Sequence, residues 1–187
     1  KTVVAGQAVF SGGSSAMKVA AELKAEGPDP VALLHQIGAD VLPLPVQGSA
    51  NLSLNVNGLV RDGLGVTLQI DAGGVVLDGV FKTGAEGTKE GYKGTFSVKS
   101  GDAAPVLQAL TFPLPDAAIS IPVDLKAAIS TSNDLVQLDR ITGTVGEKIV
   151  SGQLALARST GKVAGTLEFD RLSLAGLSSL VLGTPTS

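Results

Sequence analysis

The residues that could carry out catalysis are few and widely spaced in this sequence. The chain of 187 residues holds one histidine, His35, and no cysteine. This excludes thiol catalysis, disulfide scaffolds and cysteine or multi-histidine metal sites within one chain. The Gly-x-Ser-x-Gly turn that presents the nucleophile of many serine hydrolases does not occur either. We interpret His35 as a solvated residue of a short helix, with a role in binding as the alternative.

Two pairs of carboxylates and one glycine-rich segment are the remaining candidates for chemistry. The pairs are Asp134 with Asp139 and Glu168 with Asp170. Either pair could meet across strands as an acid/base couple or a calcium site, but neither has the spacing of a calcium loop. Segment 84–91 lacks the order of a phosphate-binding loop and joins two predicted strands. Solvated sheet positions and a hairpin tip explain these residues, so the sequence predicts no enzyme, no cofactor and no metal site.

Composition narrows the classes of partner. The chain has 14 basic and 17 acidic residues, a net charge of -3, and no block of like charge, which argues against a nucleic-acid surface. Hydrophobic residues make up 44% and aromatic residues only 3%. No apolar stretch reaches the roughly 20 residues of a membrane-spanning helix, and no signal peptide follows Lys1. Because the chain begins without Met, we expect it to be part of a longer protein.

Alternation of apolar and polar residues is the dominant pattern and predicts β-strands. Leu52, Leu54 and Val56, for example, alternate with asparagine and serine. Short glycine-containing turn sequences such as Asp62-Gly63 separate the alternating segments, so we expect hairpins and an antiparallel meander. The predicted strands are 3–11, 15–26, 48–58, 64–72, 74–83, 90–99, 117–131, 134–144, 147–158 and 162–170.

Three short helices interrupt the strands and indicate an internal repeat. Asp29, followed by Pro30, is a good N-cap. Asp102 has the same place before 103–110, and the third helix covers 174–182. The offset from Asp29 to Asp102 recurs between Gly79 and Gly152. We therefore predict a single repeat-built β-rich domain over 1–187, with units of approximately 1–46, 47–116 and 117–187.

The predicted fold class is mainly β with short α-helices. We expect a curved antiparallel β-sheet built of about 73-residue repeats, forming an open groove or a partly closed barrel. One aliphatic face on ten strands is more apolar surface than three short helices can cover. The excess must be hidden by closure, by a partner or by an apolar ligand. The alternative is a self-contained β-sandwich whose two inner faces cover each other.

The candidate functional residues are the apolar members of this alternation. With almost no Tyr or Trp among them, they suit acyl chains better than sugars or nucleotides. Gly79 and Gly152 share their parity. The opposite, solvated face is predicted to hold Ser53, Thr67, Thr95 and Gln153. The predicted apolar groove consists of Leu52, Leu54, Val56, Val66, Leu68, Ile70, Tyr92, Phe96, Val98, Leu154, Leu156, Val163, Leu167 and Phe169.

The last third of the chain resembles the C-terminal region of AsmA-family proteins. The resemblance is good from Val123 onward and looser over the preceding repeat. Its motifs are made of Gly and Leu at strand spacing. They are Leu138-x-x-Ile141-x-Gly143-x-Val145-Gly146, then Gly152-x-Leu154-x-Leu156, Gly165-x-Leu167 and Leu172-x-Leu174.

The resemblance implies a protein of the bacterial envelope. Members of the family are held in the inner membrane by one N-terminal helix, which this chain lacks, and their bulk lies in the periplasm. Their repeated β-groove is associated with phospholipid movement to the outer membrane and with envelope assembly, and no catalytic residues are known. The implied partners are a phospholipid or other acyl-chain ligand and the envelope membranes, with no nucleic acid. The competing hypothesis is an adhesin-like or carbohydrate-binding-like scaffold module.

Overall fold

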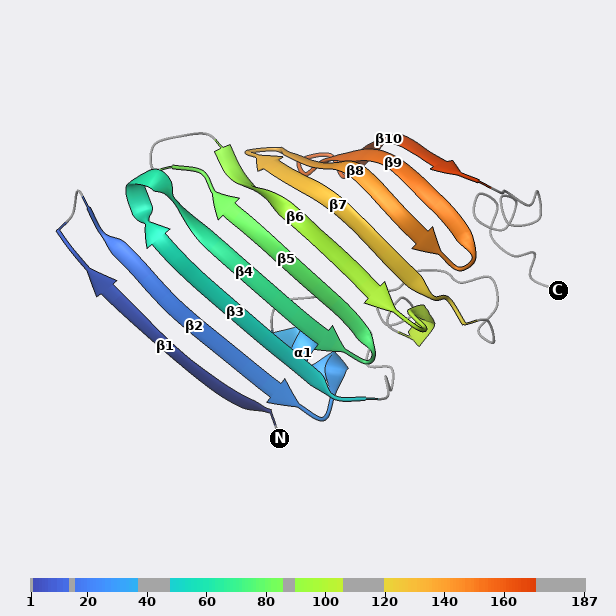
Figure 1. Ribbon diagram of the computed structural model, residues 1–187. Helices are drawn as coiled ribbons and strands as arrows, with labels where there is room; N and C mark the ends of the chain where they lie inside the picture. Colours follow the sequence, from blue (N-terminus) through green and yellow to red (C-terminus); the bar gives the residue numbers. More distant parts are fainter. Residues whose placement is uncertain (1, 14–15, 37–47, 86–89, 106–119, 171–187) are drawn as a thin grey trace.

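The computed structural model describes residues 2–13, 16–36, 48–85, 90–105 and 120–170. Within these residues the chain forms one ten-stranded antiparallel sheet in which every strand pairs with its sequence neighbours (Figure 1). The mainly β fold class and the antiparallel meander are therefore confirmed. The strands are β1 (Val3–Ser11), β2 (Lys18–Gly27), β3 (Ala50–Leu59), β4 (Gly63–Ala72), β5 (Val75–Thr83), β6 (Glu90–Ser100), β7 (Val123–Ser132), β8 (Leu135–Val145), β9 (Lys148–Ala157) and β10 (Lys162–Phe169).

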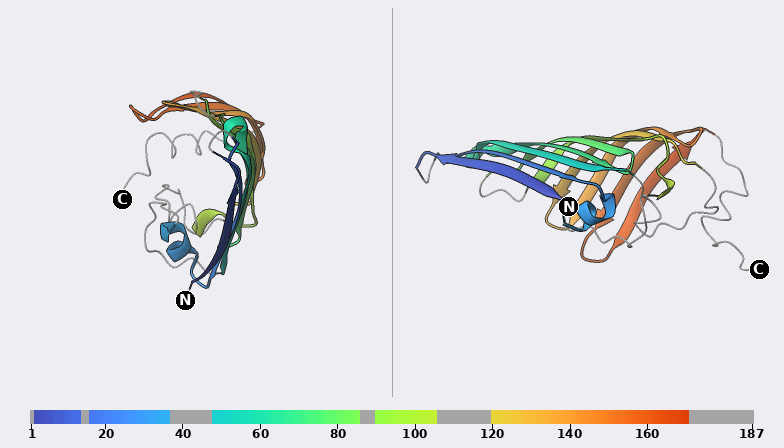
Figure 2. Two further views of the ribbon diagram at one scale, coloured as in Figure 1. Left: turned by 90° about the vertical axis from the view of Figure 1, so that its left-hand side faces the viewer. Right: turned by 90° about the horizontal axis from the view of Figure 1, so that it is seen from below.

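The sheet is curved and does not close on itself. Among the described strands β1 pairs only with β2, and β10 only with β9. Figure 2 shows the sheet as an open arc, with helix α1 (Pro30–Gln36) on the inside of the curve. Of the two predicted forms, an open groove and a partly closed barrel, the described sheet has the open one. The alternative of two facing sheets is wrong for the described strands, because all of them belong to one sheet.

Most predicted strand boundaries agree with the structure to within one or two residues. The exceptions are the starts predicted at 15 and 117, which lie outside the described residues; within them β2 begins at Lys18 and β7 at Val123. Pro122, directly before β7, has no N–H to donate to a ladder. The first predicted helix is present as α1. Of the second, only its start at 104–105 is described as helical, and the third lies outside the described residues. The proposed unit boundaries at 46 and 116 also fall outside the described residues.

Pairing places apolar side chains directly opposite one another across the sheet. Leu52 lies between Ala25 of β2 and Ile70 of β4, and Ile70 in turn pairs with Leu77 of β5. Residues that face each other in an antiparallel pair point to the same side. One face therefore collects the apolar parity of every strand. Because α1 packs on it and it lies inside the curve, we call it the concave face, and the opposite one the outer face.

Helix α1 anchors the best-buried part of the concave face. The Asp29 carboxylate accepts the N–H groups of Val31 at 2.9 Å and Ala32 at 3.1 Å, which caps the first turn. Leu33 is 1% exposed and packs on Ala25, Ala50 and Leu52. Because alanines occupy two of these sheet positions, the helix can approach the strands closely.

Strand β8 contains a bulge that keeps its apolar residues on the concave face. Ala128 of β7 pairs with Asp139, whereas Lys126 pairs with Thr142, so one extra residue lies in β8. Arg140 has a φ of 51°, the left-handed conformation typical of a bulge. After the bulge the apolar parity changes, and Ile141 is buried on the same face as Leu138. Without it, half of β8 would turn polar side chains inward.

Gly152 lies in β9, with β8 on one side and β10 on the other. It pairs with Ile141 on one side and Leu167 on the other, and its φ is 152°. A Cβ atom at this position would meet the carbonyl oxygen of Thr166 and would lie 3.0 Å from the Cα of Leu167. Both contacts are with backbone, which cannot rotate away.

We therefore expect Gly152→Ala to lower the free energy of unfolding by about 2–4 kcal/mol, because backbone strain and a steric clash add. The matched control is Gly101→Ala, where a Cβ would meet no atom within 4 Å. That control should change stability by less than about 0.5 kcal/mol. Urea unfolding followed by circular dichroism measures both, and equal effects of the two changes would contradict the close packing at Gly152.

Asp134 ties two turns together at one end of the sheet. Its Oδ1 accepts the backbone N–H of Ser159 at 2.8 Å, and its Oδ2 accepts the Ser159 hydroxyl at 2.9 Å. The backbone N–H of Arg158 also donates to the Asp134 carbonyl at 2.7 Å. These hydrogen bonds favour the charged carboxylate, so the Ser159 hydroxyl and then its N–H hold the pKa of Asp134 below its ordinary value.

A carboxyl whose pKa is lower in the folded than in the unfolded state stabilises the fold above its unfolded pKa and loses this effect as the pH falls. Asp134→Asn should therefore destabilise the protein at pH about 6.5 and have a much smaller effect at pH about 2.5. Ser159→Ala removes only the hydroxyl bond and should show the same pH dependence with a smaller amplitude, and the double variant should lose less than the sum of the two single changes, because both changes remove that bond. Parallel stability curves for wild type and Asp134→Asn across this range would contradict it.

Candidate functional site

The structure places all fourteen predicted apolar residues on the concave face. Within each strand they alternate with polar neighbours, and across strands they pair with one another, as Leu54 pairs with Leu68 and Val163 with Leu156. They extend from β3 to β10. The positions are Leu52, Leu54, Val56, Val66, Leu68, Ile70, Tyr92, Phe96, Val98, Leu154, Leu156, Val163, Leu167 and Phe169.

Burial on the concave face depends on distance from one end of the strands. The described segments that cover the face are α1 and the turn at 103–105, and both lie at the end where β2, β4 and β6 finish (Figure 2). Ala50, Ala72 and Val123 are buried there. At the opposite end of the interior strands the same face is more open, with Tyr92 of β6 39% and Leu156 of β9 37% exposed.

Sequence reasoning missed several members of this face. Phe81 and Tyr92 form an edge-to-face aromatic pair with ring centroids 6.2 Å apart. The Phe81 ring lies over Gly79 and against Gly94, where a Cβ would collide with it. An aromatic ring that covers cross-strand glycines shields the exposed backbone. Leu77, Phe81, Leu125 and Ile129 carry the parity of the predicted set, so the same alternation, followed through every strand, would have found them.

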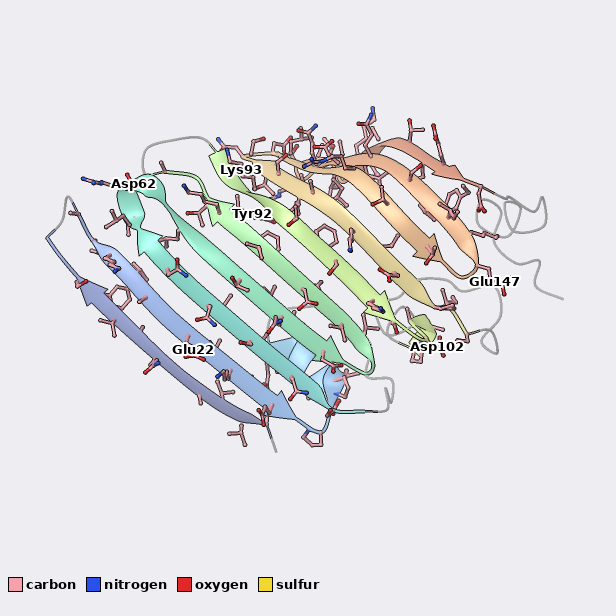
Figure 3. The ribbon with its side chains drawn as sticks, in the orientation of Figure 1. Glu22, Asp62, Tyr92, Lys93, Asp102 and Glu147 are labelled. Atoms are coloured by element: carbon pink, nitrogen blue, oxygen red, sulfur yellow. The ribbon has the colours of Figure 1, made fainter. Side chains whose placement is uncertain are left out.

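The outer face is mainly polar. Gln69 donates to Asp78 at 3.0 Å, and Lys24 forms an ion pair with Glu22 at 2.8 Å. This hydrogen-bonded ion pair lowers the pKa of Glu22 and raises that of Lys24. Figure 3 shows Glu22 on this face. The four residues predicted to be solvated, Ser53, Thr67, Thr95 and Gln153, lie here and are half-buried or exposed.

The outer face also carries features that its polar pattern does not predict. Val80 and Ile149 are 61% and 58% exposed there. A shallow hollow of about 420 Å³ lies over β5–β8 and is lined by Thr95, Ser97, Lys126 and the bulge residue Arg140, together with Asp78. Its mixed charge and open shape give no single ligand chemistry.

One carboxylate of each pair considered for catalysis binds a neighbouring turn. Asp134 binds the turn at Ser159, and Asp170 accepts the backbone N–H of Ile149 at 2.9 Å. His35 is exposed at the end of α1. Among the described residues no three metal-ligating side chains gather at one point. The helices in the described part of the chain are too short to cross a membrane.

The described strands form a single layer, because all ten belong to one sheet. Against this geometry, comparison with known proteins adds no relative, because no protein-family model, no curated protein and no solved structure matches the chain.

Proposed function

We propose that the concave face binds the hydrocarbon chains of phospholipids, and that the protein carries lipid in the bacterial envelope in the manner of AsmA-like proteins. One observation carries the proposal. An aliphatic face continues across all ten strands, and the described covering segments lie only at one end of it. An apolar surface of this extent calls for an apolar partner.

The chemistry of the face favours an acyl chain over a sugar or a nucleotide. The whole chain has no Trp, one Tyr and five Phe, so stacking platforms are scarce. Each CH₂ group removed from water contributes about 0.8 kcal/mol, so even a half-covered acyl chain is held by several kcal/mol. The fourteen predicted residues of this face carry no charge that would grip a headgroup, so a bound chain can slide along them, as transport requires.

The dimensions of the sheet suit this role. Ten strands at about 4.8 Å spacing extend over roughly 43 Å. One leaflet of a bilayer core is about 15 Å thick, half of the usual 30 Å. An acyl chain that lies across the strands therefore occupies three or four of them, and the face has room for more than one.

The resemblance of residues 123–174 to AsmA-family proteins supports the cellular setting. In the proposed setting the protein is tethered to the inner membrane by a helix outside this sequence, and its sheet faces the periplasm. The internal repeat predicted above is part of the same proposal. β3 and β7 begin at Ala50 and Val123, and β5 and β9 begin at Val75 and Lys148, so both pairs of strand starts share the offset of that repeat.

Lipid analysis of the purified chain tests the proposal directly. The protein is purified without detergent, and its organic extract is analysed by mass spectrometry. We expect phospholipid in the extract of folded protein, and displacement of a fluorescent long-chain fatty acid when phospholipid is added. Folded protein that yields no lipid and does not bind the fatty acid would overturn the proposal and favour the scaffold-module hypothesis.

A charge on the open end of the concave face should reduce this binding. Leu156 is partly exposed on that face and pairs with Val163, so Leu156→Asp should remain folded. It should lower fatty-acid binding about tenfold or more, because a carboxylate must lose water to meet the chain. Gln153→Asp, on the outer face of the same strand, is the control and should bind like wild type. Equal binding by both variants would place the ligand elsewhere.

A further inference from the structure

Two lysines face each other on the outer side of β5 and β6, near the open end of the sheet. Lys82 pairs directly with Lys93 in the ladder, and both side chains are exposed. Like charges at facing positions of an antiparallel pair destabilise a sheet. At no other paired position of the described strands do like charges meet, and Lys99, farther along β6, faces Asp124 of β7. The fold itself therefore gains nothing from placing Lys82 and Lys93 together.

The two lysines form part of the wall of a small hollow between β5, β6 and β7. The hollow has a volume of about 150 Å³, and its wall also includes Tyr92 of β6 and Ser130 and Thr131 of β7. A bulge shapes it, because Gly91 and Tyr92 both lie opposite Thr131, whose hydroxyl accepts the Tyr92 N–H at 2.9 Å. The wall thus contains two ammonium groups and the hydroxyl of Ser130 as hydrogen-bond donors.

The charges of the sheet are distributed unequally between its two ends. Near the strand ends and in the turns between them, the described basic residues outnumber the acidic ones at the open end, where Arg61 and Arg158 lie in addition to the two lysines. The reverse holds at the end covered by α1, and Figure 3 shows Asp102 and Glu147 there, away from Lys93 and Tyr92. This distribution of charge attracts an anion to the open end.

We propose that this hollow binds the phosphate group of a phospholipid whose hydrocarbon chain lies on the neighbouring part of the concave face. Tyr92 belongs to both surfaces, because it lines the hollow and forms the aromatic pair with Phe81 on the concave face. A tyrosine suits such a boundary, since its ring is apolar and its hydroxyl is polar. This inference rests on the proposed function and adds an anionic headgroup to it.

A phosphate at this place would complement the two lysines. Ammonium groups donate strong, charge-assisted hydrogen bonds to phosphate oxygens, and a bound negative charge offsets the repulsion between Lys82 and Lys93. Because both lysines are exposed, solvent screens the attraction and keeps it modest. Such a site holds a headgroup reversibly, which is compatible with a lipid that moves along the apolar face.

Binding of two lipids with the same saturated chain tests the site. Lysophosphatidylglycerol carries a phosphate and monoacylglycerol does not, and calorimetry below their micelle concentrations measures both. We expect wild type to bind the phosphate-bearing lipid about tenfold more tightly, because each exposed lysine adds a modest attraction. Lys82→Gln combined with Lys93→Gln should remove this preference and leave binding of monoacylglycerol unchanged. High salt should reduce the preference of wild type in the same way.

The matched control is Lys99→Gln combined with Lys126→Gln. It removes the same number of charges from the outer face of β6 and β7, nearer the covered end, and should keep the preference. Urea unfolding checks that both double variants are folded. The Lys82 and Lys93 variant should be at least as stable as wild type, because it loses a repulsion.

The outcomes separate this inference from the proposed function. Equal affinity of wild type for the two lipids, or an equal loss of preference in the control variant, would overturn the headgroup site and leave hydrocarbon binding in place. Failure of wild type to bind either lipid would overturn both proposals. Glycerol phosphate, which has no hydrocarbon chain, should compete weakly. Competition as strong as that of the lysolipid would assign the hollow to a free phosphate and not to a lipid.

Discussion

The structure depends on neighbouring strands presenting their apolar residues to the same side of the sheet. A single-layered sheet is held by its backbone ladders and by side chains that meet across them, so each strand must present its apolar parity to the same side as the one before. Leu52, Ile70 and Leu77 follow one another in this way on β3, β4 and β5. In β8 the sequence changes parity, and the bulge at Arg140 restores the phase. The continuity of the concave face rests on that correction.

A sheet with one layer has little interior, and this property links stability to function. The best-packed cluster is small and lies under α1, where Leu33 meets two alanines of the sheet. Away from it a few aliphatic side chains, such as Ile141 and Val150, are buried, and most of the other described ones are half-buried or exposed. In a two-layered fold such residues would form the core. Here the same residues form an accessible surface, which is why an apolar ligand is the natural partner to propose.

Several acidic residues of the chain accept backbone N–H groups at the ends of strands and at the start of α1. Asp29 caps α1, Asp102 accepts the N–H groups of Ala104 and Ile121, and Asp134 and Asp170 hold neighbouring turns. Turn ends leave backbone N–H groups without ladder partners, and a carboxylate is a strong acceptor for them. This use explains the recurrence of Asp beside strand ends, and it accounts for members of both carboxylate pairs that had suggested catalysis.

The strands, their antiparallel order and the side on which most apolar residues lie could be read from the sequence, because alternation with a period of two and glycine-rich turns are local properties. The bulge at Arg140 and the exposed Val80 and Ile149 of the outer face could not. This alternation predicted fourteen residues of the concave face, and the other members of the face, such as Phe81, share the same pattern. The link to the AsmA family stays a prediction from residues 123–174. Only the tertiary structure decided that the sheet stays open, that no second sheet among the described residues faces it and that α1 packs at one end of the strands. These features depend on twist summed over ten strands and on contacts between segments far apart in the chain, and no local pattern contains them.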